Sequence, residues 1–396
     1  MRVGMILDEE FPPDPRVENE ALSLIEAGHE VFLFCLNYTK KFENKLINEI
    51  QVKSYPSTKL TYKLSALAYT LPFYKVLLAS KITHFISENN IEILHIHDIR
   101  IAGTVFFVNQ KFNLKTVLDL HENRPEIMKY YPHLLKFPGK YLISPKKWKK
   151  KEESFLIKSD KIIVVTKESK EEILSRVNIG NTKIVIVPNT VRINFYKDAK
   201  VNDEIFASYK EKFVLLYIGD TGLRRGLQTA IKAIKVLKDS IKNIQLVIVG
   251  KNSSDSVLRN LTNDLELKEY IDFVGWKNPD LFKDYILSSD ICISPLHRNL
   301  HHDTTYANKI FQYLSLGKPV LVSNATAQKN IVEKYNTGLV HEDRNVKGFV
   351  DKTLLLYNDK SLREKLGANG KHFIENEFSW EHTSKKLLHL YDNLSS

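Results

Sequence analysis

Short apolar runs alternate with amphipathic stretches along this chain, and that alternation restricts the fold more than any other feature. In the first half, the strand-like runs occupy residues 3–7, 30–36, 93–96, 116–120, 161–165 and 184–187. Helix-like stretches at 17–27, 101–111 and 167–176 lie between them. Such alternation predicts a parallel sheet covered by helices. Ligands in such sheets bind outside the carboxyl ends of the strands, so the residues that follow strands are candidate site residues.

The same alternation resumes in the second half, after a charged stretch that ends near Lys210. The strand-like runs there occupy residues 213–218, 245–249, 271–274, 291–294 and 319–323. A chain of 396 residues exceeds the size at which a single core stops growing, so two domains are expected. We expect the first domain at residues 1–190, the second at 191–375 and a final helical segment at 376–396.

The composition is that of an ordinary globular protein, with 43% hydrophobic and 27% charged residues. The two cysteines, Cys35 and Cys292, lie in unrelated apolar runs, so no disulfide framework or cysteine metal site is expected. This usage fits a reducing cytoplasm. The chain opens on a strand-like run followed by acids, which is unlike a signal peptide. The longest apolar run, residues 64–74, is too short to span a bilayer.

The stretch from Thr304 to Asn324 carries the first candidate binding residue. It predicts a helix from about Asn308, a plausible N-cap, to Leu316, with Gly317 in the left-handed position that ends many helices. Lys309 would lie in the first turn, where its charge opposes the helix dipole. A cation in that place indicates an anionic ligand, most simply a phosphate. The alternative is a solvated lysine.

A glycine-rich loop after the strand at 213–218 carries the second set. Gly219, Gly222 and Gly226 would let the backbone approach a ligand closely, and Arg224 and Arg225 precede the next helix. The loop is neither a G-x-G-x-x-G dinucleotide motif nor a P-loop. Arg225 and Lys309 could converge on a diphosphate. Gly250, which ends the next strand, is assigned to the same ligand site.

Polar clusters also follow strands of the first half. His95, His97 and Asp98 end one strand, and His121, Glu122 and Arg124 follow the next. For His121 we weigh a functional role at a strand end against an ordinary hydrogen-bonded histidine. Neither cluster has partners at metal-ligand spacing, so no metal site is predicted.

Arg16 follows a proline-rich loop and begins the next predicted helix. It could bind an anion at the site, or it could pair with a nearby acid.

The segment from Lys129 to Lys151 contains eight lysines and no acid. Aromatic and leucine residues lie between the lysines, a mixture that suits the headgroup layer of an anionic membrane. The alternative is a solvated surface loop and helix start. Nucleic acid is not expected as a partner, because no recognition module accompanies the patch.

Several short motifs, in this order and spacing, are similar to those of one enzyme family. They are EAGHEV at 26–31, IVPNT at 186–190, YIGD at 217–220 with RG at 225–226, LVIVG at 246–250, IDFVG at 271–275, SSDICISP at 288–295, NKIFQYLSLGKPV at 308–320 and FSWE at 378–381. The chain resembles the retaining glycosyltransferases of family 4. The resemblance covers nearly the whole chain and implies the GT-B architecture: two Rossmann-like α/β domains facing a cleft, with a C-terminal helix crossing back to the N-terminal domain.

The resemblance also implies an activity. The second domain would hold a nucleotide-sugar donor, with Arg225 on the diphosphate and Asn308 and Lys309 beside it. His121 matches the family's histidine at the junction of sugar and acceptor, and we place Arg16, Glu122 and Arg124 on the acceptor side. The reaction would move a sugar to a glycan or a lipid-linked acceptor with retained configuration. Protein cations would replace a metal, and no cofactor is implied. The expected location is cytoplasmic, at the inner face of the cell membrane.

Four features depart from the family pattern, and the first is the absence of a glycine pair from the loop that contains Pro12, Pro13 and Arg16. Two glutamates are replaced by Thr304 and Gln312, and the arginine expected after Gly219 is Asp220. Gln312 can still accept a hydrogen bond from a ribose, although more weakly than a carboxylate. These departures motivate the alternative of a catalytically inactive GT-B accessory or sugar-binding subunit.

Overall fold

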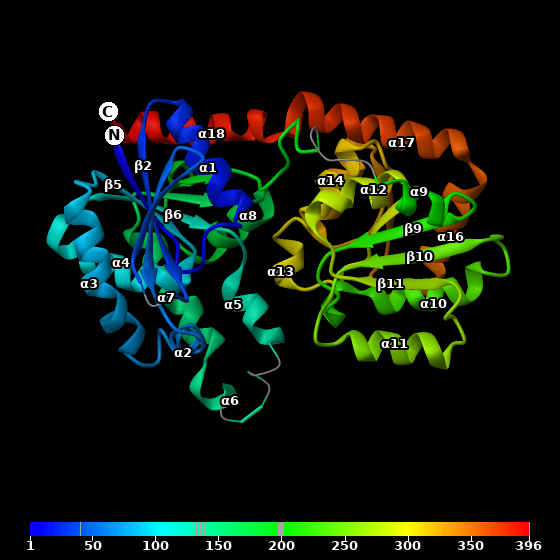
Figure 1. Ribbon diagram of the computed structural model, residues 1–396, viewed down its shortest axis with the longest axis horizontal. Coiled ribbons are helices and arrows are strands. Elements are labelled where there is room, and N and C mark those ends of the chain that lie inside the picture. The colour runs from blue at the N-terminus through cyan, green and yellow to red at the C-terminus, as the bar shows by residue number, and fades with distance from the viewer. Residues whose placement is uncertain (40, 132–133, 135, 138, 197–201, 396) are drawn as a thin grey trace. The chain divides into compact units, whose positions relative to one another are not determined.

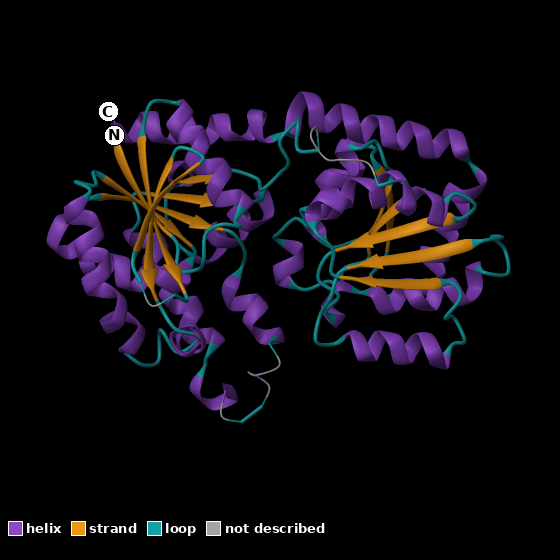
Figure 2. Cartoon of the chain, in the orientation of Figure 1, coloured by secondary structure: helices purple, strands orange, loops and turns teal. Residues whose placement is uncertain are grey.

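The computed structural model describes the chain except residues 40, 132, 133, 135, 138, 197–201 and 396. It forms two compact units. The first unit comprises residues 1–189 together with 383–396, and the second comprises residues 190–382 (Figure 1). Each unit contains one sheet with helices packed against it (Figure 2).

The sheet of the first unit has eight strands in the order β3-β4-β2-β1-β5-β6-β7-β8. The strands are β1 (Arg2–Ile6), β2 (Glu30–Asn37), β3 (Glu43–Ile47), β4 (Ile50–Pro56), β5 (Ile93–His97), β6 (Lys115–Leu120), β7 (Lys161–Val164) and β8 (Ile184–Ile186). All neighbours pair in parallel except β3 with β4. The sequence did not predict β3 and β4, because their residues alternate weakly and β3 is an exposed edge strand.

The helices of the first unit are α1 (Pro15–Glu26), α2 (Lys59–Ser65), α3 (Phe73–Glu88), α4 (Ile99–Phe112), α5 (Arg124–Ile127), α6 (Gly139–Leu142), α7 (Pro145–Lys158) and α8 (Lys167–Arg176). Helix α1 matters most for the site. Asp14 caps it by accepting from the backbone N–H groups of Arg16 and Val17, and Pro15 occupies its first turn. This start fixes Arg16 at the carboxyl edge of the sheet, as expected from the sequence.

The C-terminal helix α18 (Trp380–Ser395) begins in the second unit, but from Thr383 onward it belongs to the first. Tyr391 on this helix is buried in the first unit, with its hydroxyl 2.8 Å from Nδ1 of His95. The final helix therefore returns to the N-terminal unit, as the family resemblance implied.

The sheet of the second unit has six parallel strands in the order β11-β10-β9-β12-β13-β14. They are β9 (Phe213–Ile218), β10 (Ile244–Val249), β11 (Ile271–Gly275), β12 (Ile291–Ser294), β13 (Val320–Ser323) and β14 (Gly338–His341). The helices are α9 (Asp203–Tyr209), α10 (Leu227–Leu237), α11 (Asp255–Asp264), α12 (Phe282–Leu287), α13 (Leu300–Asp303), α14 (Lys309–Ser315), α15 (Thr326–Tyr335), α16 (Val346–Asn358) and α17 (Lys360–Phe373). Strand β14 was not predicted.

Helix α14 is shorter than expected. It begins at Lys309, and the Asn308 side chain makes no capping hydrogen bond because its backbone, with φ −51° and ψ −29°, is already helical. Gly317 ends the helix with φ +69°, as predicted. The N–H of Gly317 donates to the carbonyl oxygen of Leu314 at 2.9 Å, and the N–H of Lys318 donates to that of Tyr313 at 3.1 Å. These two hydrogen bonds form a Schellman motif.

Throughout the described part of the chain, no helix combines the length and apolar character needed to cross a bilayer.

Candidate functional site

Three histidines lie together at the carboxyl ends of β5 and β6 in the first unit. His95 and His97 are two residues apart on β5, and their rings stack with centroids 4.6 Å apart. His121 follows β6, and its Nε2 lies 3.1 Å from Nδ1 of His97. Residues two apart on a strand share one face, so both strands direct these side chains to the same place.

Asp119 is the carboxylate that this histidine cluster shares. Its Oδ2 lies 2.8 Å from Nε2 of His121, and Arg16 grips both oxygens, with Nη2–Oδ1 at 2.7 Å and Nε–Oδ2 at 3.0 Å. Burial by itself would raise the pKa of Asp119. The charges of Arg16 and His121 outweigh burial and hold that pKa well below its usual range.

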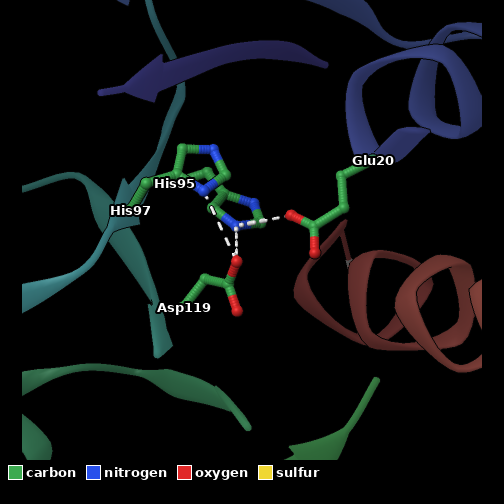
Figure 3. Close-up of side chains that lie close together, drawn as sticks. All are labelled: Glu20, His95, His97 and Asp119. Atoms are coloured by element: carbon green, nitrogen blue, oxygen red, sulfur yellow. Dashed lines mark ion pairs between the residues drawn. The ribbon is translucent and has the colours of Figure 1, made fainter. Parts of the chain in front are cut away.

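Glu20 completes the buried network from helix α1. Its Oε1 lies 2.8 Å from Nη2 of Arg16, and its Oε2 lies 3.3 Å from Nε2 of His95. Figure 3 shows Glu20 and Asp119 approaching the rings of His95 and His97. The other nitrogen of His95 meets Tyr391, so the network extends to the C-terminal helix.

The histidines differ in their protonation. Burial favours neutral His121, but the charge of Asp119, the hydrogen bond to it and the charge of Asp98 together raise the pKa of His121 to about 9. Burial lowers the pKa of His97 below its ordinary value, and the hydrogen bond to Asp119 does not compensate. Burial also favours a neutral His95, but the hydrogen bonds to Asp119 and Glu20 and the charges of these acids raise the pKa of His95 above its ordinary value. At neutral pH a charged His121 therefore lies beside a neutral His97.

Glu20, His95, His97 and Asp119 also form the kind of group that could bind a metal, since their ligand atoms lie within 4.8 Å of one another. Their nitrogen and oxygen donors are of the types that zinc accepts. The Arg16 guanidinium, however, already lies 2.7–2.8 Å from both carboxylates. A divalent cation here would be repelled by that guanidinium, and the two negative charges are already balanced. The residues therefore do not fit a metal.

The sequence did not reveal this group, because Glu20 comes from a helix far along the chain from β5 and β6. One local signal was available. Arg16 and Glu20 are four residues apart on a helix and therefore share one of its faces.

For Arg16, the structure shows the second of the two alternatives, in which its guanidinium pairs with acids of the protein. Its side chain is only 2% exposed, and its donors are taken by Asp119, Glu20 and the carbonyl oxygen of Val187 at 3.1 Å. The guanidinium cannot also present itself to an acceptor sugar, so the expected acceptor-side role is replaced by that of an internal counterion.

Glu122 and Arg124 flank His121 at the edge of the network. Nη2 of Arg124 lies 3.0 Å from Oδ2 of Asp98, and its Nε lies 3.4 Å from Oε1 of Glu122. The backbone N–H of His121 approaches Asp98 at 3.4 Å. These partly exposed side chains surround the one histidine that reaches the surface, and their acceptor-side role stays a prediction.

The second unit brings three cations together after β9. Arg224 and Arg225 lie in a short 3-10 helix (Leu223–Arg225), and Lys309 comes from α14. Asp220 is the carboxylate within reach, 3.3 Å from Nε of Arg225 and 3.5 Å from Nη2 of Arg224. Nζ of Lys309 lies 3.3 Å from the ring centroid of Tyr217 and has no ion-pair partner among the described residues.

This cluster has more positive than negative charge. Burial and the neighbouring charge of Arg225 lower the pKa of Lys309 well below its ordinary value. The pKa of Asp220 is lowered, because the charge of Arg225 outweighs burial. Cations held together with too few counterions are stabilised by an anionic ligand, so the geometry supports the predicted convergence of Arg225 and Lys309.

Asp220 has a second function in its loop. Its carboxylate also accepts from Nδ2 of Asn252 and from the backbone N–H of Gly222, the latter at 3.3 Å. Asp220 stands where the family pattern has an arginine. It orients Arg224 and Arg225 and fixes the loop that leads to them.

His302 supports Arg224 and was not predicted from the sequence. Its Nδ1 lies 2.7 Å from the carbonyl oxygen of His297, so it donates there, and its Nε2 lies 3.0 Å from Nη1 of Arg224 and accepts. Burial and the nearby charge of Arg225 lower the pKa of His302 to about 3. The ring is neutral, and it holds the arginine by a hydrogen bond.

The glycines of these loops allow neighbouring backbone segments to pack closely against each other. Gly250 has φ +150°, and a Cβ there would lie 1.9 Å from the carbonyl oxygen of Gly219. Gly226 has φ +78°, and a Cβ would lie 1.7 Å from the carbonyl oxygen of Pro295. The close backbone approach expected at Gly226 is thus to the protein itself, and Gly250, which was assigned to the ligand site, also packs against protein backbone. Gly222 lies against the Asp220 carboxylate, where a Cβ would come within 3.2 Å of Oδ2.

The remaining predicted donor residues are spread around α14. The buried hydroxyl of Thr304 donates to the carbonyl oxygen of Leu300 at 2.7 Å, which ties it to the first residue of α13. Gln312 is half-buried on α14, and its amide makes no hydrogen bond within the described residues. Asn308 is exposed beside Lys309.

Two units with parallel, Rossmann-like sheets and a C-terminal helix that returns to the first unit define the GT-B class. Two family models divide the chain in the same way: "Glycosyltransferase Family 4" matches residues 16–195 and "Glycosyl transferases group 1" matches residues 198–373. The chain belongs to the family 4, group 1 glycosyltransferases.

Named relatives agree with this assignment. The capsular polysaccharide biosynthesis glycosyltransferase CapM of Staphylococcus aureus is 24% identical over 58% of this chain and 61% of its own length. The uncharacterized glycosyltransferase MJ1178 of Methanocaldococcus jannaschii is 24% identical over 94% of this chain and 93% of its own length. The structure of HepE from Anabaena in complex with UDP superposes with a TM-score of 0.74 and 11% identity over 99% of this chain and 100% of that one.

Proposed function

We propose that this protein is a retaining glycosyltransferase, which moves a sugar from a nucleotide-sugar donor to a glycan or a lipid-linked acceptor without a metal. One observation carries the proposal. Arg224, Arg225 and Lys309 lie together in the second unit, where Asp220 pairs with the two arginines and the charges of all three of these residues act on Lys309. A diphosphate supplies the negative charge that this cluster lacks. UDP bound to HepE, a structural neighbour, supports a nucleotide diphosphate as the ligand.

The cations would contribute to both binding and chemistry. Breaking the bond between the sugar and the diphosphate leaves extra negative charge on the departing phosphate, and preorganised cations stabilise that charge most when it has fully developed. A bound diphosphate would raise the lowered pKa of Lys309 again, because its negative charge favours the ammonium form. The departing phosphate would take the acceptor proton while the acceptor attacks the same face of the sugar. The protein's contribution is then positioning and charge stabilisation.

The test is a panel of UDP- and GDP-linked sugars, in which binding is followed by calorimetry and turnover by release of the nucleotide. We expect binding of at least one donor, turnover that continues in excess EDTA, and a product whose anomeric configuration by NMR matches that of the donor. Failure of every donor to bind would refute the proposal. Loss of turnover in EDTA would overturn the metal-free part, and inversion would overturn the retaining part.

The alternative is an inactive accessory or sugar-binding subunit of the same fold. Thr304 favours it, since its hydroxyl is engaged with α13 and replaces a family glutamate. So does Gln312, which accepts hydrogen bonds more weakly than a carboxylate. This alternative predicts donor binding without turnover. Turnover that is lost in His121→Ala, while the far-ultraviolet circular dichroism stays unchanged, would exclude it.

We also propose that the protein works at the inner face of an anionic membrane through the segment from Lys129 to Lys151. Residues 132, 133, 135 and 138 of this segment lie outside the described residues. Phe137 is 85% exposed and Tyr141 75%, next to the exposed Lys136 and Lys140. Aromatic rings beside lysines are suited to the headgroup layer.

A neighbouring segment enlarges this surface. The hydroxyl of Thr70 donates to the carbonyl oxygen of Leu142 at 2.8 Å, which brings the turn that precedes α3 against the end of α6. Three apolar side chains near that contact are strongly exposed: Phe73, Val76 and Leu77. Exposed apolar side chains beside lysines are typical of a lipid-binding surface.

Parts of the segment do not join this surface. Trp148, Leu134 and Ile143 are buried in the core. Lys149 pairs with Glu172 at 2.7 Å, and Lys129 pairs with Glu126 at 2.6 Å. The predicted membrane contact is therefore restricted to the lysine and aromatic residues of this segment that are exposed.

The membrane proposal is tested by pelleting with anionic vesicles. Replacing Lys146, Lys147, Lys150 and Lys151 by glutamine should abolish salt-sensitive pelleting, because each cation near such a surface contributes about 1 kcal/mol. The matched control replaces four exposed lysines of the second unit: Lys232, Lys242, Lys268 and Lys365. Pelleting that is lost equally in both variants, or in neither, would refute the assignment.

A further inference from the structure

His121 is the surface end of a buried chain of hydrogen bonds and ion pairs that starts in the C-terminal helix. In order, the members are Tyr391, His95, Glu20, Arg16, Asp119 and His121. The first five are almost completely buried, whereas the His121 side chain is 20% exposed. The chain of contacts therefore ends at one imidazole edge that a substrate can reach.

The contacts fix which nitrogen of His121 carries a proton. Asp119 is ionised and can only accept, so Nε2 of His121 must donate to it across 2.8 Å. The carboxylate cannot turn away, because Arg16 holds both of its oxygens. Nδ1 of His121 makes no hydrogen bond within the described residues. A neutral ring would then offer Nδ1 as an acceptor, and a charged ring would offer it as a donor.

We propose that His121 works as an imidazolium whose Nδ1–H donates to an oxygen of the substrate, and that Asp119 is the positioning residue that keeps the ring charged and aimed. The role toward substrate rests on the function proposed above, whereas the charge state does not. In this arrangement His121 cannot serve as a general base, because both of its nitrogens carry protons. It supplies a fixed, positively charged hydrogen-bond donor to the substrate.

The groups that face His121 are of both signs. Asp119 from β6 and Asp98 from the end of β5 favour the charged ring, while Arg16 from α1 and His97 from β5 lie on the opposing side. Two considerations decide the outcome. His97 is neutral at neutral pH, and the charge of Arg16 is shared between two acids at 2.7–2.8 Å.

The remaining charges nearby belong to Arg124 and Glu122, which contact each other. Arg124 also pairs with Asp98 at 3.0 Å and so weakens the pull of that acid. The direct contact of Asp119 therefore dominates, and the ring stays charged through neutral pH.

The first measurement uses the wild-type chain without any substrate. NMR of protein with carbon-13-labelled histidine, with the His121 signal assigned by its absence in His121→Gln, gives the titration midpoint. We expect a midpoint near 9. A midpoint at or below about 6.5, the ordinary value for histidine, would overturn the proposal.

The second measurement assigns the cause. Asp119→Asn keeps the shape but removes the charge, and should lower the midpoint by about 1–3 units, the range for one opposite charge in close contact. The matched control is Asp160→Asn. Asp160 accepts from Thr116 at the opposite end of β6 and does not touch His121, so the midpoint should not move. An unchanged midpoint in Asp119→Asn, or an equal shift in both variants, would overturn the role of Asp119.

The third measurement links charge to transfer. Above the midpoint the ring loses the Nδ1 proton, so the transfer rate should fall above about pH 9 and the fall should begin at lower pH in Asp119→Asn. A transfer rate that does not change with pH as His121 titrates would overturn the donor role while leaving the proposed function intact. A midpoint near 9 with no transfer from any donor would refute the proposed function while leaving the charge assignment intact.

Discussion

The two polar clusters of this protein are built on opposite electrostatic plans. In the first unit, Arg16 and His121 share Asp119, Glu20 supplies the second negative charge, and each cation faces an acid inside the protein. In the second unit, Arg224 and Arg225 pair with Asp220, and Lys309 lies nearby without an ion-pair partner among the described residues. A balanced, buried network holds side chains in place, whereas an unbalanced, partly exposed cluster is completed by a ligand. Stability should therefore depend on the first cluster and donor affinity on the second.

The sharpest test of this contrast removes one acid from each cluster. Asp119→Ala leaves Arg16 buried with too little negative charge and should lower the free energy of unfolding of the first unit by about 3–5 kcal/mol. Asp220→Ala should cost the second unit less than about 1 kcal/mol, because its ion pairs are partly exposed. Pulsed hydrogen exchange across a urea series reads the peptides of each unit separately. Similar losses in both units would break the comparison.

The next largest effect concerns a cation of the second unit. Lys309→Met should lower kcat/KM about 100-fold, since that is the usual effect of removing one preorganised charge or donor from a transition state. Unfolding stability should not fall, because the lysine has no acid to lose. Lys232→Met, on an exposed position of α10, controls for the loss of charge. A Lys309→Met variant with lowered unfolding stability and unchanged kcat/KM would contradict this prediction.

Proton linkage gives an intermediate effect. In the free protein, burial and Arg225 lower the pKa of Lys309, and a bound diphosphate should raise it again. Binding of UDP at alkaline pH should therefore take up a proton, by up to about one per site. Calorimetry in buffers of different ionisation enthalpy measures this uptake, which should vanish in Lys309→Met. Proton release on binding would contradict the sign.

The smallest effect is expected at Asp220. Asp220→Asn removes the competing carboxylate but keeps the hydrogen-bonding shape, so affinity for UDP should rise by up to about fivefold, or ~1 kcal/mol. Calorimetry at two salt concentrations can follow the change, which should shrink as salt increases. Weaker binding would mean that orientation of the arginines by Asp220 matters more than its charge.

The sequence predicted the features that depend on nearby residues. Each strand of the second unit except β14 follows its apolar run, and Arg225 and Lys309 were placed because each follows a strand or begins a helix. The same reasoning failed where residues distant in sequence meet. Arg16 and Asp119 are brought together by packing of α1 on the sheet, and nothing local to either residue specifies the other. Asp220 was interpreted as an anomaly, although the two arginines that it pairs with follow it by only four and five residues.

The glycines show a second limit. Gly226 was expected to let the backbone approach a ligand and Gly250 was assigned to the ligand site, but the groups packed against them are the carbonyl oxygens of Pro295 and Gly219. A glycine in a sequence indicates that space is needed and does not say for what.

The position of Tyr391 in the chain has a consequence for synthesis. Its hydroxyl closes the network around His95, yet it is translated after the whole second unit, which occupies residues 190–382 without interruption. The second unit can fold while the ribosome is still working. Until its last helix emerges, the first unit lacks the hydroxyl that contacts Nδ1 of His95. The part of the protein that is made first is thus the part that is finished last.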